Sequence, residues 1–441
     1  MVSKDYQYAL KPDNELALTL ESCGQDQWQL PVLGPSFVGD QSGDTWLLQL
    51  TYQSTHKKKL GEISIVSEGK EKGAEGTQYF EANQQGVRYL NLTGLSLDRP
   101  VRLHTEYCEI TSDVRLLGFK SPDFSDGPIL ILAPHADDAE LAAYGFYRHW
   151  SAQTWIVTIN AGQSLPKLDR QYIRRLDDQL SDAAIHKAQI RAWNSVTTPL
   201  LAGVDQQRLI NLGYFDLTTP LLYQRPDEAQ TNAQAPDLSP QVARRWNPLA
   251  LPSDDQNISS GAALIDDLAY LLEHIKPSTV LVTEPEIDPH AEHQMTAHAL
   301  ALAMKKSQHR VERVLMYVNH LHQTKAFPYG PEHARTALPP WFDPDSVLGA
   351  YQCYSFGLSG SVQKEKIMAF DTMHDLRSKP RWEKTFKQWW SRKVKKSGYR
   401  FYADHAYFQT HIKADEVFTW VNAQHFSECL TRSQGASLLS S

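Results

Sequence analysis

Residues 128–140 read PILILAPHADDAE, a continuous apolar run followed at once by a histidine and three carboxylates. A short segment that is apolar at successive positions is typical of a strand buried on both faces of a sheet. Residues 139–150, AELAAYGFYRHW, have a helical pattern, and residues 154–162, TWIVTINAG, form a second buried run. The stretch therefore predicts a β-α-β unit whose polar cluster lies in the loop between strand and helix.

The same alternation continues along the chain. Residues 167–192 predict a charged helix, residues 263–275 predict another helix, and residues 279–283 (TVLVT) predict another buried strand. Strands that alternate with helices favour a parallel sheet with right-handed crossovers. We therefore expect the α/β fold class, with a Rossmann-like parallel sheet in a catalytic domain over residues 123–430.

Two parts of this region give weaker patterns. Residues 217–260 form a long polar insertion rich in Pro and Gln. A loop of that length inside a compact domain is usually a functional lid or disordered. After about residue 325 we expect mixed helical and loop structure that covers one side of the sheet.

The first part of the chain, residues 1–122, has a different character. It contains short alternating segments separated by Gly, Asn, Asp and Lys clusters, at residues 46–52, 61–66, 87–93 and 101–110. Such segments are typical of antiparallel strands joined by turns. We expect a β-sandwich-like accessory domain, with carbohydrate binding and a structural or oligomerisation role both open.

Composition narrows the class of protein. The 441 residues carry a net charge of −7 and are 41% hydrophobic, as in an ordinary globular protein. This balance argues against a nucleic-acid partner, and no segment has the pattern of a signal peptide or a transmembrane helix. The four cysteines are scattered and form no C-x-x-C pair. We expect a cytoplasmic protein, with the inner face of the membrane as a further location; the sequence does not fix the oligomeric state.

A second polar cluster, DPHAEH at residues 288–293, follows the strand expected at 279–283. Both clusters therefore fall at the carboxyl ends of parallel strands, where open α/β sheets bind ligands. Two imidazoles and a carboxylate, with water as a further ligand, are the set that catalytic zinc takes in proteins. The metal lowers the pKa of water and polarises a scissile carbonyl. We expect one Zn²⁺ per chain, although another divalent metal such as iron also suits these ligands.

Taken together, the two clusters resemble the signature of the LmbE/PIG-L family of zinc-dependent N-deacetylases. The first departs from it at Ala136, where the family has Pro, and at Glu140, which is displaced by one residue. The second resembles the family's H-P-D-H element, with Ala291 and Glu292 in place of Pro and Asp. The resemblance covers roughly residues 125–325, and a segment at 415–421 (DEVFTWV) is similar to the family's closing segment. The metal ligands that it implies are His135, Asp138 and His293.

The resemblance also implies an activity. Asp137 would be the general base, and His290 would be the general acid or the partner of the oxyanion. The substrate would be an N-acetylglucosamine-type amino sugar in a glycan, glycolipid or glycoconjugate, from which the N-acetyl group is removed. Two alternatives stay open: a zinc hydrolase that acts on another amide or on an ester, and a carbohydrate-binding protein with a structural metal.

Other residues are candidates for contact with the substrate. Asn160 and Gly162 end the second strand near the same edge, although turn chemistry explains the glycine equally well. Arg174 and His374 are further candidates for substrate binding. Residues 377–400 are basic and carry several aromatic side chains. Such a segment suits a peripheral membrane or anionic-glycan contact, and an amphipathic helix with its tryptophans packed inward is the simpler alternative.

Overall fold

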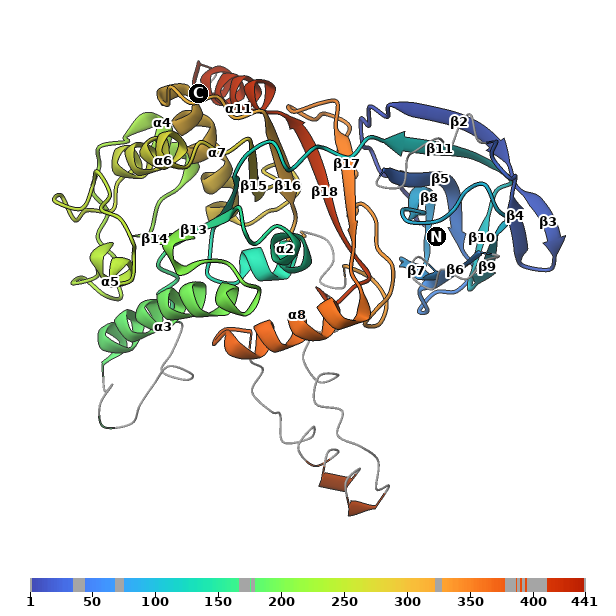
Figure 1. Cartoon of the computed structure of the whole chain (residues 1–441), viewed down its shortest axis with the longest axis horizontal. Helices are drawn as coiled ribbons and strands as arrows, with labels where there is room; N and C mark the ends of the chain where they lie inside the picture. The colour runs from blue at the N-terminus through green and yellow to red at the C-terminus, as the bar shows by residue number, and fades with distance from the viewer. Residues whose placement is uncertain are drawn as a thin grey trace.

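The computed structural model describes residues 2–34, 44–67, 75–165, 175, 179–321, 327–376, 386, 389–390, 393–394 and 411–439. The N-terminal part contains two β-sheets, drawn in blue to teal in Figure 1. The six-stranded sheet has the order β1-β8-β5-β11-β2, with β10 also paired to β5. Its strands are β1 (Val2–Ser3), β2 (Asn14–Thr19), β5 (Thr45–Ser54), β8 (Gln84–Asn91), β10 (Cys108–Ile110) and β11 (Asp113–Phe119). The five-stranded sheet, in the order β3-β4-β9-β6-β7, contains β3 (Glu21–Gly24), β4 (Gln27–Leu30), β6 (Gly61–Ser67), β7 (Gly76–Phe80) and β9 (Val101–Glu106).

Both faces of the six-stranded sheet contribute side chains to hydrophobic cores. Leu48 and Leu116 point into the core shared with the five-stranded sheet, whereas Leu47 and Leu117 belong to the core of the C-terminal part. This alternation follows from the two-residue repeat of a strand. The expected single strand at residues 101–110 is divided into β9 and β10, because Tyr107 between them adopts a left-handed backbone with φ 59°.

The C-terminal part is built on one seven-stranded sheet in the order β14-β13-β12-β15-β16-β18-β17. The first five strands are parallel, and β18 pairs antiparallel with both β16 and β17. Their bounds are β12 (Ile129–Ala133), β13 (Thr154–Asn160), β14 (Leu209–Tyr214), β15 (Thr279–Thr283), β16 (Arg313–Tyr317), β17 (Gln352–Gly357) and β18 (Asp415–Asn422). Ile129 and Ile131 of β12 face one hydrophobic core, and Leu130 and Leu132 face the other. Burial on both faces explains why this strand is apolar at every position.

Helices cover both faces of this sheet (Figure 1). Helices α2 (Asp138–His149), α3 (Leu180–Leu201) and α8 (Gly360–Thr372) lie on one side. Helices α4 (Thr219–Gln224), α6 (Gly261–Ile275), α7 (Ala291–Lys306) and α11 (Ala423–Leu439) lie on the other. The short elements α5 (Gln241–Arg244) and η1 (Gln206–Arg208) flank β14. None of the described helices is long and apolar enough to cross a membrane.

Three sequence-based expectations need correction. The helix expected at 167–192 begins at Leu180 and runs to Leu201, because Val196 and its neighbours bury a further apolar face. Of the two alternatives for the insertion at 217–260, a lid or a disordered segment, the second is wrong, because the insertion is packed, with Arg244 buried against Asp267 at 3.0 Å. Beyond residue 325 the chain adds β17 and β18 to the sheet rather than only covering it.

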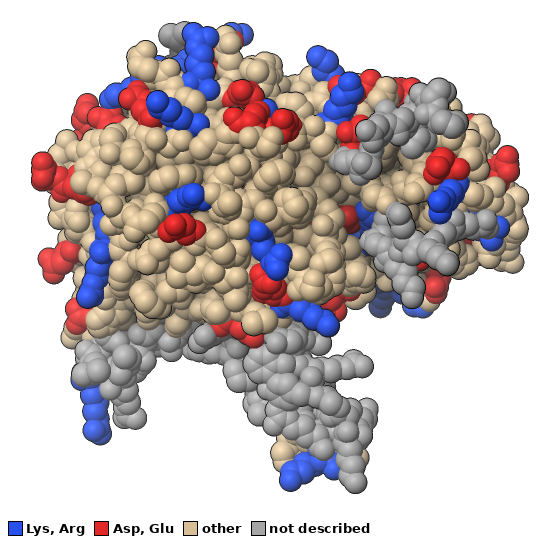
Figure 2. Space-filling model, in the orientation of Figure 1, with Lys and Arg blue, Asp and Glu red and all other residues tan. Residues whose placement is uncertain are grey.

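Surface charge is mixed on the face shown in Figure 2, where the described Lys and Arg side chains are interspersed with Asp and Glu. Of the basic segment at 377–400, the structure describes only residues 386, 389–390 and 393–394. Phe386, Trp389 and Trp390 are all about half exposed, at 57%, 51% and 47%. The tryptophans described there are therefore not packed inward.

Candidate metal centre

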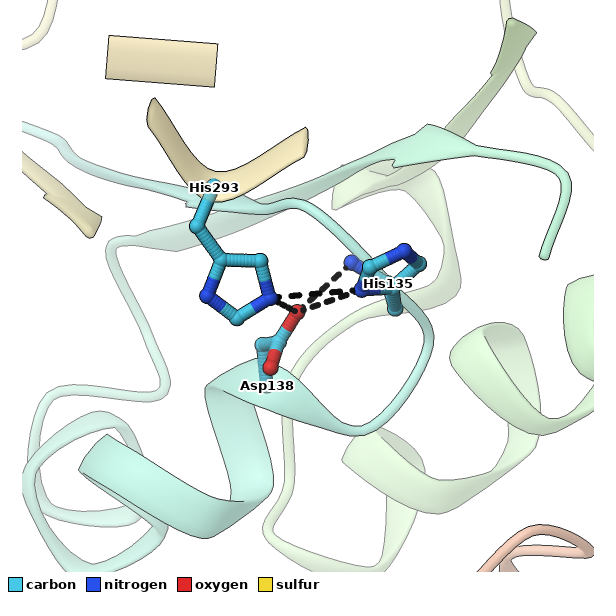
Figure 3. A group of neighbouring side chains, drawn as sticks. All are labelled: His135, Asp138 and His293. Carbon is cyan, nitrogen blue, oxygen red and sulfur yellow. Dashed lines mark hydrogen bonds and ion pairs between the residues drawn. The ribbon is translucent and has the colours of Figure 1, made fainter. Parts of the chain in front are cut away.

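Two loops at the carboxyl edge of the sheet bring the polar clusters together. His135 follows β12, Asp138 is the first residue of α2, and His293 lies in the first turn of α7, which follows β15. Figure 3 shows the three side chains pointing toward one another from these elements. His293 and Asp138 are buried, at 0% and 2% exposed, and the His135 side chain is 14% exposed.

Three ligand atoms form a nearly equilateral triangle. Asp138 Oδ2 lies 3.3 Å from His135 Nδ1 and 3.3 Å from His293 Nε2. The two imidazole nitrogens are 3.4 Å apart. A tetrahedral zinc ion with ligands at about 2.0–2.1 Å separates its ligand atoms by about 3.3 Å. The triangle therefore has the size that such an ion requires.

The surroundings fix which nitrogen of each imidazole faces the triangle. His135 donates from Nε2 to Glu292 Oε2 at 2.7 Å, so its Nδ1 faces the triangle and offers a lone pair to a metal once it is deprotonated. His293 donates from Nδ1 to Asp288 Oδ2 at 2.9 Å, so its Nε2 presents a lone pair as well. Carboxylates that hold ligand imidazoles in this way are usual at metal sites. In this arrangement two imidazole nitrogens and one carboxylate oxygen converge on one point. Such a set of electron-pair donors binds a cation.

The pKa shifts of these groups reflect the same demand for positive charge. Burial lowers the pKa of His135, but hydrogen bonds to Asp138 and Glu292 outweigh it and raise that pKa to about 9. Burial also acts against charge on His293, and the Asp138 carboxylate overcomes it and raises the pKa to about 10. Burial raises the pKa of Asp138, but the neighbouring His293 charge and hydrogen bonds bring it well below its ordinary value. In the metal-free cluster, protons on the histidines thus supply the positive charge that a bound metal would otherwise provide.

Asp288 holds the second loop together. Its Oδ2 accepts from His293 Nδ1 and from the backbone N–H groups of Asn319 and His320, the latter two at 3.1 Å. Its Oδ1 accepts from the backbone N–H of His290 at 3.1 Å. Asn319 also donates from Nδ2 to Asp138 Oδ1 at 2.8 Å. The sequence placed Asp288 in the motif without a role; the structure makes it the link between both halves of the site.

The predicted base lies beside the triangle. Asp137 is the N-cap residue of α2 but makes no capping hydrogen bond from its side chain within the described chain. Instead its Oδ1 accepts from Arg191 Nη2 at 3.0 Å. Burial raises the pKa of Asp137, and the Arg191 charge opposes that rise. A carboxylate that is more basic than usual, and held in place, suits proton abstraction.

Arg191 was not anticipated from the sequence. It is 8% exposed and also binds Asp375, which in turn lies 3.3 Å from Lys187 Nζ. Gly162 makes room for it, since a Cβ on this residue (φ +63°) would stand 2.4 Å from Arg191 Nε. Nothing local in the sequence links a helix residue to a carboxylate 54 positions earlier.

The predicted acid, His290, lies beside the ligand histidines and is partly buried. Its ring centre is 4.7 Å from that of His293 and 5.2 Å from that of His135. Burial lowers its pKa, and the positive charges of His293 and His135 add to the effect. His320 has its ring centre 5.5 Å from that of His290. His290 is thus held as a neutral imidazole within a group of four histidines.

The remaining candidates are placed unequally. Asn160 is 4% exposed and donates from Nδ2 to Pro134 O at 3.1 Å, next to His135. His374 adjoins Asp375, with 3.4 Å between Nδ1 and Oδ1, and so reaches the Arg191 network rather than the metal ligands. Arg174 lies outside the described residues.

Several buried polar atoms around the site have no hydrogen-bond partner among the residues described. They are Asn160 Oδ1, Arg191 Nε, His290 Nδ1 and Asn319 Oδ1. A buried polar atom without a partner costs free energy. Their concentration around one centre fits a site that receives further ligands.

Comparisons with known proteins give little. No protein-family model matches the chain, and no curated protein matches it. Among solved structures, the 4-carboxy-2-hydroxymuconate hydratase GalB from Pseudomonas putida is 13% identical, with 66% of this chain and 95% of that chain covered and a TM-score of 0.35. An acetyl xylan esterase from Butyrivibrio proteoclasticus is 11% identical over 67% of this chain and 83% of that chain, with a TM-score of 0.16. TM-scores this low carry no argument about function, which must come from the site.

Proposed function

We propose that this chain is a metal-dependent N-deacetylase of the LmbE/PIG-L type that acts on an N-acetylglucosamine-type amino sugar in a glycan, glycolipid or glycoconjugate. The observation that carries the proposal is the ligand triangle of His135, Asp138 and His293, at 3.3–3.4 Å, with a basic carboxylate next to it. A purely structural zinc site closes its coordination with four protein ligands, whereas a catalytic site has three.

A divalent ion held by these three residues would polarise the acetamide carbonyl and lower the pKa of water. Asp137 would take the proton of the attacking water, because burial makes it more basic and Arg191 keeps its carboxylate oriented. The overall change is hydrolysis of the amide to a free amine and acetate. The proton that Asp137 accepts would leave with the amine.

His290 would support the oxyanion that develops during attack. Its lowered pKa keeps the ring neutral, so that it can donate one N–H without carrying a full charge. A preorganised neutral donor of this kind stabilises a developing negative charge and needs no reorganisation.

Metal content is the first test. Plasma mass spectrometry of the purified protein should find about one zinc or iron per chain. The His293→Ala variant should lose the metal, because the substitution removes one ligand of the triangle and also the buried imidazole that binds Asp288. Wild-type protein without metal, or metal unaffected by the substitution, would overturn the metal centre.

The second test separates binding of the metal from catalysis. Asp137→Asn should retain the metal and lose about 10²–10⁴-fold in the rate of acetate release from N-acetylglucosamine conjugates. Asp98→Asn, an exposed charge removal in the N-terminal part, is the matched control and should leave the rate unchanged. Full activity in Asp137→Asn would refute its role as base. If the enzyme releases another acyl group, or an alcohol from an ester, and no acetate from amino sugars, then the proposed substrate class is wrong and that other amide or ester takes its place.

A further inference from the structure

A groove of about 1020 Å³ lies where the N-terminal sheets meet the C-terminal part. We call it the junction groove; its walls include Lys4, Asp5 and Glu81 on one side and Glu286, Phe342 and Asp343 on the other. Pockets for drug-sized ligands have volumes of about 300–1,000 Å³. The junction groove is therefore larger than one sugar ring needs.

The junction groove adjoins the candidate metal centre through two loops. Ile287 and Leu321 line it. Ile287 immediately precedes Asp288, whose carboxylate holds His293, and Leu321 immediately follows His320, whose ring centre is 5.0 Å from that of His293. The groove and the metal centre therefore share the loops at residues 287–288 and 320–321.

Its walls are fixed by packing. The backbone N–H of Gln7 donates to Trp341 O at 2.8 Å. Tyr6 packs edge-on against Phe342 with ring centres 5.6 Å apart, and Lys4 Nζ lies 5.1 Å from the centre of the same Phe342 ring. Because the N-terminal segment is held against residues 341–342, the groove exists before any ligand binds, which lowers the entropic cost of binding.

The lining selects the charge of the occupant. Among the lining residues that the structure describes, Asp5, Glu81, Glu286 and Asp343 carry carboxylates and Lys4 carries an ammonium group. The buried Arg88 neutralises Glu81 at 3.0 Å, and the groove remains acidic. Clefts lined by one sign of charge concentrate ligands of the opposite sign.

Several of its polar atoms are acceptors. Besides the carboxylates, Gln84 lines the groove with a buried Oε1 that has no partner within the described part of the chain. Acceptors of this kind bind hydroxyl and ammonium groups, whereas an anionic glycan would meet repulsion.

We propose that the junction groove binds an amino-sugar oligosaccharide that carries free amines, as the sugar units next to the one at the metal. This inference rests on the proposed function, since deacetylation turns a neutral acetamide into an ammonium group. Each turnover would then strengthen the hold of the acidic groove on the chain. The N-terminal sheets would form one wall of the substrate site.

The test is calorimetric titration of the full-length, metal-loaded protein with a glucosamine pentamer, which contains no acetyl group to remove. The variant Asp5→Asn/Asp343→Asn removes two exposed charges, while each side chain keeps an oxygen for the backbone N–H it accepts, those of Val87 and Asp345. Affinity should fall about five-fold or more and depend on salt. The control Asp98→Asn/Glu109→Gln removes two exposed charges outside the groove and should bind like the wild type.

Two results would overturn the proposal. One is equal affinity for the pentamer in the groove variant and the wild type. The other is equally tight binding of a lysine pentapeptide, which would show recognition of charge without sugar. Calorimetric titration needs no turnover, so it tests the groove independently of the proposed function. If the wild type hydrolyses no N-acetyl sugar but the groove variant loses pentamer binding, the groove is supported and only the proposed function is refuted.

Discussion

Replacing Asp288 by Asn should weaken zinc binding without removing a ligand. The Asp288 carboxylate is 0% exposed and accepts four N–H groups, one from the His293 ring and three from the backbone. Asparagine has a single acceptor oxygen, so its NH₂ must face at least one of these donors. The substitution also removes the buried charge that makes the His293 ring a stronger ligand. Partners of this kind are worth about 10–100-fold in metal affinity, or about 1.4–2.7 kcal/mol.

The assay is competition with a chromophoric zinc chelator at constant pH. Glu292→Gln is the matched comparison, because Glu292 also holds a ligand imidazole, at 2.7 Å from His135, but its side chain is 30% exposed. Water can replace that hydrogen bond, so the loss should be less than about ten-fold. Circular dichroism of the metal-free variants controls for folding. Zinc affinity of Asp288→Asn within about two-fold of wild type, or a larger loss in Glu292→Gln, would refute this reasoning.

Three further predictions follow from the same contacts. The free energy of unfolding of the metal-free protein should fall as pH rises from about 6.5 toward 10. The fold raises the pKa values of His135 and His293 to about 9 and about 10, so both lose their stabilising protons over that range. Urea denaturation at several pH values measures the change in stability, and the apparent zinc affinity should rise over the same interval. Gly162→Ala should lower the melting temperature and the rate of acetate release together, since the left-handed backbone costs about 1–2 kcal/mol and the added Cβ meets Arg191; an unchanged melting curve would contradict it. Lys366→Met strips a buried carboxylate of its ammonium partner at 2.8 Å and should cost about 3–5 kcal/mol in chemical denaturation, whereas exposed Lys305→Met should cost little.

Local patterns of apolar and polar residues predicted much of the secondary structure. Residues 279–283 were expected as a buried strand from five successive apolar or β-branched residues, and β15 has those bounds. The helix expected at 263–275 begins two residues earlier, at Gly261, because Ser260 caps it by accepting from Ala263 N. These features depend on a few neighbouring residues, because the buried face of a helix or strand gives a regular spacing of apolar residues in the sequence.

The sequence indicated which residues could bind a metal. PHADD follows one predicted buried strand and DPHAEH follows another, which places His135, Asp138 and His293 at one edge of a parallel sheet. Only the tertiary structure decided that their ligand atoms converge at 3.3–3.4 Å, that Arg191 holds Asp137, and that β17 and β18 extend the sheet antiparallel. The reason is physical: local periodicity records whether a side chain is buried, whereas its partner is chosen by packing between segments far apart in the chain. The junction groove is of the second kind, since neither of its walls has a binding pattern alone.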